Sequence, residues 1–105
     1  MDQHLQQFLS TLSTDKGYSE NTIAAYRNDL TQFAKFMREQ RGGQLTPTEI
    51  SVELVQAYVE NIQQPDGGYA PSTVARKIAA VKSFFHYLAE RQLITTDPAV
   101  HLTSP

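Results

Sequence analysis

The chain has 105 residues, of which 40% are hydrophobic and 19% charged, which is enough for one folded domain with a modest core. Its formal net charge of -2 alone gives no reason to expect nucleic-acid binding. It contains no cysteine, which excludes disulfides and thiol chemistry, and its three histidines are too far apart in sequence to suggest a metal site. There is no signal-peptide pattern and no long apolar stretch, so we expect a cytoplasmic chain with no membrane contact. We also expect no cofactor and no small-molecule ligand.

Four helices are predicted in chain order, beginning with a short one over residues 2–11. The second helix begins after Ser19, a good N-cap residue, and apolar residues then recur at alternating spacings of three and four. It should end near Arg41, because Gly42 and Gly43 follow.

The second half of the chain predicts two more helices. Residues 46–49, Thr-Pro-Thr-Glu, have the form of a capping box that starts a single turn, and Ser51 then caps the third helix. The fourth helix begins at Pro71, behind the poor cap Ala70, and runs to about Arg91. A further single helical turn is expected over residues 99–102. No segment alternates with a period of two, so the predicted fold is all-α, a four-helix bundle in one domain over residues 1–105, with a linker beginning at 103–105.

The charges are unevenly distributed along the chain. Residues 44–66 carry four acidic side chains and no Lys or Arg, whereas residues 71–91 have a local sum of +3. Chance could produce this pattern, since the charges are few.

A helical wheel of the fourth helix places Arg76 and Ser83 opposite a narrow apolar stripe, with small residues such as Ala80 beside them. Lys77 and Lys82 flank the stripe. One interpretation is a solvated surface, on which alanine and serine are merely tolerated. The other is a face that approaches an anionic partner closely, as the major groove of duplex DNA would require.

Two segments carry a resemblance to a known family. GYSENTIAAYRNDLTQFAKFM, residues 17–37, resembles the G-x-S-x-x-T-x-x-x-Y-x-x-D-L-x-x-F pattern that opens tyrosine recombinases, and STVARKIAAVKSFFHYLAERQLITTDPAVHL, residues 72–102, resembles the second half of the same domain. The resemblance implies a core-binding domain, a SAM-like four-helix bundle whose second and fourth helices face duplex DNA. It also implies that the catalytic residues belong to a second domain, so this chain alone is not expected to be an enzyme.

The resemblance and the wheel together nominate a set of DNA-contacting side chains. They belong to the start of the second helix and to the outward face of the fourth. We expect an isolated monomer and a full-length parent that acts as a tetramer on DNA. The nominated residues are Ser19, Asn21, Thr22, Arg27, Ser72, Thr73, Arg76, Lys77, Ala80, Lys82 and Ser83.

A helical protein-interaction module that keeps the fold without binding DNA is the alternative, and the acidic third helix favours it. The outward position of Arg76 predicts that Arg76→Ala changes the free energy of unfolding by no more than about 0.5 kcal/mol.

Overall fold

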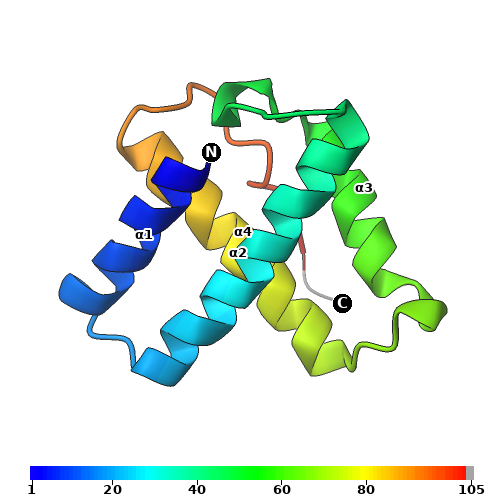
Figure 1. Cartoon of the computed structure of the whole chain (residues 1–105), viewed down its shortest axis with the longest axis horizontal. Coiled ribbons are helices and arrows are strands. Elements are labelled where there is room, and N and C mark those ends of the chain that lie inside the picture. Colours follow the sequence, from blue (N-terminus) through cyan, green and yellow to red (C-terminus); the bar gives the residue numbers. More distant parts are fainter. Residues whose placement is uncertain (104–105) are drawn as a thin grey trace.

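The computed structural model describes residues 1–103 and is all-helical, as the sequence predicts (Figure 1). No strand occurs within these residues. Two short 3-10 turns separate the third helix from its neighbours. In chain order the elements are α1 (Asp2–Thr14), α2 (Glu20–Arg41), η1 (Pro47–Glu49), α3 (Val52–Gln63), η2 (Pro65–Gly67) and α4 (Pro71–Glu90).

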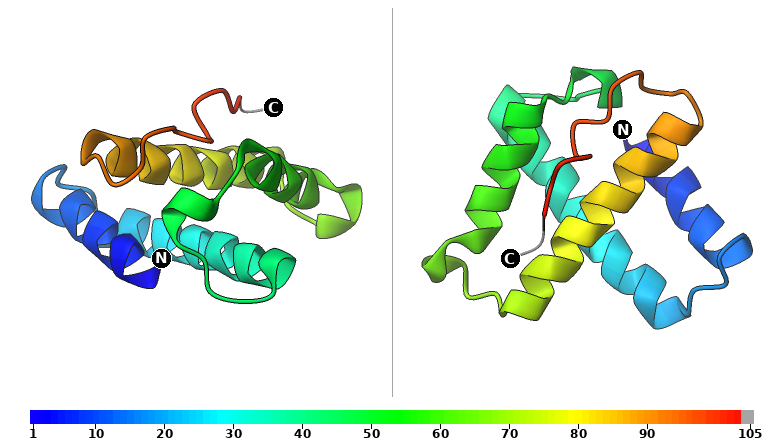
Figure 2. Two further views of the ribbon diagram at one scale, coloured as in Figure 1. Left: turned by 90° about the horizontal axis from the view of Figure 1, so that it is seen from above. Right: turned by 180° about the vertical axis from the view of Figure 1, so that it is seen from behind.

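The four long helices form two layers (Figure 2). α1 and α2 make one layer, and α3 and α4 make the other, with α2 and α4 crossing at the centre of the molecule (Figure 1). The N-terminal ends of α2 and α4 both reach the lower edge of Figure 1. The segment after α4 returns across the outer side of the α3–α4 layer (Figure 2).

The helix ends follow the predicted punctuation, except that α1 continues to Thr14, past its predicted end at residue 11. The Ser19 side chain accepts a hydrogen bond from the Thr22 backbone N–H at 3.2 Å, and Gly42 ends α2 in the left-handed conformation at φ 75°. In η1 the Glu49 carboxylate accepts from the Thr46 backbone N–H at 2.9 Å, as the predicted capping box requires. Ala70, as expected of alanine, caps α4 with no side-chain hydrogen bond.

A chain of aromatic rings links the core across both layers. The ring of Phe8 on α1 lies 5.7 Å from that of Phe84 on α4, and the ring of Phe85 lies 5.8 Å from that of Phe33 on α2. Phe33 in turn meets Tyr58 on α3 at 5.1 Å, edge to face. Because edge-to-face pairs add to simple area burial, these contacts hold all four helices around one core.

The segment after α4 packs on the bundle but does not form the predicted helical turn. Residues 98–101 form a turn, in which the Asp97 side chain accepts a hydrogen bond from the Ala99 backbone N–H at 2.8 Å. Ile94, Ala99 and Leu102 are buried, so the segment belongs to the core. The expected linker at 103–105 lies almost entirely outside the described residues. No helix within the described part of the chain is long and apolar enough to cross a membrane.

Candidate nucleic-acid interface

A charged cluster occupies the crossing of α2 and α4. Asp29 on α2 is fully buried and accepts two hydrogen bonds from the Arg76 guanidinium, from Nε to Oδ2 and from the second terminal nitrogen to Oδ1, both at 2.9 Å. Lys77 Nζ donates to the same carboxylate at 3.0 Å. The bidentate geometry matches the planar guanidinium to the carboxylate, which is the strongest form of such a pair.

Lys77, which the wheel placed beside the apolar stripe and which was nominated as a DNA contact, is buried. Its residue exposure is 2%, its ammonium group donates to Gln32 Oε1 at 2.6 Å, and it lies 4.8 Å from the centre of the Tyr69 ring. Burial of a lysine is tolerated here because Asp29, Gln32 and the aromatic ring replace its hydration. The side chain is therefore an internal tie between α2 and α4.

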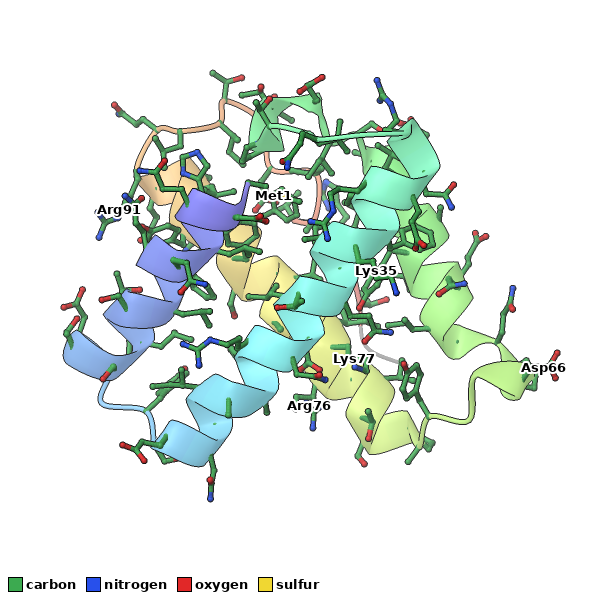
Figure 3. The ribbon with its side chains drawn as sticks, in the orientation of Figure 1. Met1, Lys35, Asp66, Arg76, Lys77 and Arg91 are labelled. Carbon is green, nitrogen blue, oxygen red and sulfur yellow. The ribbon has the colours of Figure 1, made fainter. Side chains whose placement is uncertain are left out.

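Arg76 is partly exposed, and it is also bound. Its side chain is 42% exposed and projects beside the α2–α4 crossing, towards the lower edge in Figure 3. The hydrogen bonds that Arg76 donates to Asp29 raise the pKa of Arg76 above its ordinary value, so it stays charged. The wheel predicted the exposure correctly and missed the partner.

Ala80 is fully buried, which corrects its predicted position on the outward face. It lies one turn after Lys77 and one turn before Phe84, and both of these are buried too. The buried arc of α4 is wider than the wheel assumed because α4 packs against α1, α2 and α3. A small side chain on this face allows close helix–helix approach.

Lys82 is also engaged within the domain. Its Nζ donates to the Leu102 backbone carbonyl at 2.7 Å, which ties α4 to the returning C-terminal segment. Ser83, one residue further, is half-buried and lies beside Tyr26. Burial raises the pKa of Tyr26, so its phenol stays protonated at neutral pH.

The remaining nominated residues fall into two groups. Near the ends of α2 and α4 that share the lower edge of Figure 1 lie the exposed Ser19, Asn21, Thr22 and Ser72 and the half-buried Thr73. Arg27 is exposed but lines a hollow with Gln6 and Leu9 of α1. The structure thus brings Arg76 and the hydroxyl-bearing residues to one side of the molecule and leaves Arg27 on another.

The four acidic residues of segment 44–66 are all exposed, and they lie on η1, α3 and η2. Asp66 marks the far end of this side, well away from Arg76 in Figure 3. No group of three His, Asp or Glu side chains within residues 1–103 is placed to hold a metal ion.

Comparison with known proteins assigns the chain to a family. Residues 5–92 match the family described as phage integrase, N-terminal SAM-like domain. The chain belongs to this family. The resemblance expected from the two sequence segments is therefore confirmed, and so is the SAM-like helical bundle.

Similar proteins include three tyrosine recombinases named XerC. The one from Herpetosiphon aurantiacus is 43% identical over 105 residues, covering 100% of this chain and 33% of the relative. Those from Roseiflexus castenholzii and Chlorobaculum parvum are 38% and 34% identical and cover 100% and 96% of the chain. The chain spans about a third of the length of these relatives.

The two segments that resemble the integrase family meet in the charged cluster. Asp29 occupies the Asp position in the pattern of the first segment, and Arg76 is the first of the two arginines of the second. Sequence reasoning nominated Arg76 and Lys77 but not their partners Asp29, Gln32 and Tyr69. A signal was present for Asp29, which falls three residues after Tyr26 and four before Phe33, on the apolar stripe of α2.

Proposed function

We propose that this integrase-family domain binds duplex DNA and is the core-binding part of a site-specific tyrosine recombinase. The observation that carries the proposal is family membership combined with one molecular edge. At this edge the N-terminal ends of α2 and α4 diverge from the helix crossing, and Arg76 lies between them (Figures 1 and 3). A helix N-terminus attracts phosphate, because its free N–H groups and its dipole both favour negative charge.

The proposed contact surface consists of the nominated residues that are accessible at this edge. Hydroxyl and amide side chains would donate to phosphate oxygens, and Arg76 would supply a charge-assisted contact. These residues are Ser19, Asn21, Thr22, Ser72, Thr73 and Arg76. Lys77 and Ala80 are left out because they are buried, and Lys82 because it is bound to Leu102.

The role of the domain would be to hold the DNA and to fix the position of the protein along the duplex. Phosphate contacts position a protein on the duplex, and a few contacts to base edges then help to select a sequence. Strand cleavage and rejoining through a phosphotyrosine would be performed by a second domain of the parent.

Binding by the domain alone should be weak and salt-dependent. Sequence alone suggests about three to four useful cations, but Lys77 and Lys82 make hydrogen bonds within the domain. The proposed surface contains one cation, Arg76, so with roughly one phosphate neutralised the log–log slope of affinity against salt should be near -1. A dissociation constant of about 10⁻⁴ M near physiological salt follows from the non-specific range.

An NMR titration tests the proposal. Labelled chain is titrated with a short duplex at low salt, and the amide shifts are mapped. Salt-sensitive shifts concentrated on residues 19–22 and 72–76 would support the proposal. Shifts elsewhere, or shifts that ignore salt, would refute it.

The alternative is a protein-interaction module, and the exposed acidic side chains of η1, α3 and η2 favour it. That surface would suit a basic partner rather than DNA. The alternative predicts no response to duplex DNA and shifts on residues 49–66 when a basic protein is added.

A further inference from the structure

Asp29 binds only one edge of the Arg76 guanidinium. The carboxylate binds Nε and one terminal nitrogen of the guanidinium, each at 2.9 Å. The other N–H groups of the guanidinium have no protein acceptor among the described residues, and the side chain is 42% exposed. The arginine is thus fixed in orientation while part of its donor set faces outward.

The buried Lys77 also binds the Asp29 carboxylate. Asp29 is fully buried, and Lys77 donates to its Oδ1 at 3.0 Å while also donating to Gln32 at 2.6 Å. This arrangement prevents the carboxylate from rotating away with Arg76. It also sets the charge, because one carboxylate with two cations leaves the cluster with a net charge of +1.

We propose that Asp29 is a positioning residue for DNA binding, which holds Arg76 so that its outward N–H groups meet a backbone phosphate. Buried Lys77 offsets the carboxylate, so the positioning does not cost the site its positive charge. A pre-oriented guanidinium loses less side-chain freedom on binding than a free one. The inference rests on the proposed function and adds an acidic residue to a surface that binds an anion.

The sign of one substitution separates positioning from simple charge. Asp29→Asn removes a negative charge beside Arg76, so Coulomb attraction alone predicts tighter binding to DNA. Positioning predicts the opposite, a loss of about five- to tenfold, because the amide cannot hold the guanidinium by two charge-assisted bonds. Affinity would be measured by fluorescence anisotropy with a labelled duplex at low salt.

Glu20→Gln is the matched control. Glu20 is exposed in the first turn of α2, where it lines the same hollow as Arg27, and its removal makes the same charge change without touching Arg76. It should tighten binding by about twofold. Opposite effects from the two substitutions would support positioning.

Arg76→Lys guards against a folding failure of Asp29→Asn, since it alters only the exposed partner. Lysine keeps the charge but cannot form the bidentate pair, so binding should fall by about the same five- to tenfold as expected for Asp29→Asn. The Arg76 Nε–H resonance gives an independent readout. It should be sharp and slow to exchange in the unaltered chain, and broadened in Asp29→Asn even where the melting temperature stays high.

The outcomes distinguish this inference from the function on which it rests. If the unaltered chain shows no salt-dependent binding to duplex DNA, both fall. If it binds, and folded Asp29→Asn or Arg76→Lys binds at least as tightly, Asp29 does not position Arg76, while DNA binding stands.

Discussion

The side chain of Asp29 has no access to solvent, so its stability depends on the cations that surround it. Three hydrogen bonds from Arg76 and Lys77 replace its hydration. Removing a partner from a buried charge costs more than the pair contributes when intact, because the remaining charge is left unsatisfied. The two cations differ in exposure, and their substitutions should therefore differ in cost.

Arg76→Ala should lower the free energy of unfolding by about 1 to 2 kcal/mol. This exceeds the 0.5 kcal/mol or so expected for an unpaired surface residue, because the substitution removes two hydrogen bonds from Asp29. The cost stays moderate because Arg76 is partly exposed and Lys77 remains in place. Urea denaturation measures it, and a loss below about 0.5 kcal/mol would contradict the structural role of the pair.

Lys77→Ala should cost more, roughly 3 kcal/mol, because it leaves a cavity and an under-compensated carboxylate in the interior. Lys77→Met keeps most of the volume and should recover about half of that loss. Lys35→Ala serves as a control, because Lys35 is exposed on α2 and should change stability by less than about 0.5 kcal/mol. Equal melting temperatures for Lys77→Ala and Lys35→Ala would show that Lys77 is not buried.

The N-terminal ends of α2 and α4 differ in whether a side chain caps the helix. Ser19 caps α2 with its hydroxyl, whereas Ala70 occupies the same position in α4 with an extended backbone, φ -66° and ψ 152°, and no side-chain acceptor. Ala70→Ser should therefore stabilise the domain by about 0.5 to 1 kcal/mol. Ser19→Ala is the converse and should destabilise it by about 1 kcal/mol. Thermal denaturation of both tests the pair, and destabilisation by Ala70→Ser would mean that the α4 start differs from the one described.

The C-terminal segment should loosen when its tie to α4 is cut. Lys82→Met keeps the aliphatic stem but removes the hydrogen bond to the Leu102 carbonyl. Because Leu102 N–H bonds to Ala99 within this segment, its amide hydrogen exchange reports the loss directly. We expect exchange there to accelerate about tenfold, for a loss of roughly 1 kcal/mol, while the α2 amides are unchanged. Unchanged exchange at Leu102 would show that buried Ile94 and Ala99 hold the segment without Lys82.

Sequence periodicity predicted where the helices lie in the chain well, but it predicted poorly which of their side chains are buried against other helices. The starts of α2 and α4 were predicted because capping and proline rules act within a few residues. Ala80 and Lys77 were misplaced because a wheel assigns one buried face, whereas α4 is covered from several sides. The useful signal was an opposite pair of charges on apolar stripes: Asp29 on α2, and Lys77 three residues after Val74 and four before Val81 on α4.

For the whole molecule, the two-layer arrangement separates the charges that the sequence places in neighbouring segments. The acidic residues lie on the side of η1, α3 and η2, and Arg76 lies at the edge shared by α2 and α4 (Figure 3). The sequence predicted the polarity but not its geometry, since the crossing of α2 over α4 depends on long-range packing. A net charge of -2 is therefore compatible with one anion-binding edge.

Neutralising the acidic side tests this separation. Glu53→Gln with Glu60→Gln raises the formal net charge from -2 to zero without touching the proposed edge. If DNA lies at the α2–α4 edge, affinity should rise by about twofold at low salt and lose that gain near 0.15 M salt, because distant charges are screened. Asp15→Asn with Glu20→Gln makes the same charge change at the end of α1 and the start of α2, closer to the edge than α3, so its gain should be larger and persist to higher salt. A larger gain from the α3 pair would place the DNA against α3, and no effect from either pair would favour a protein partner.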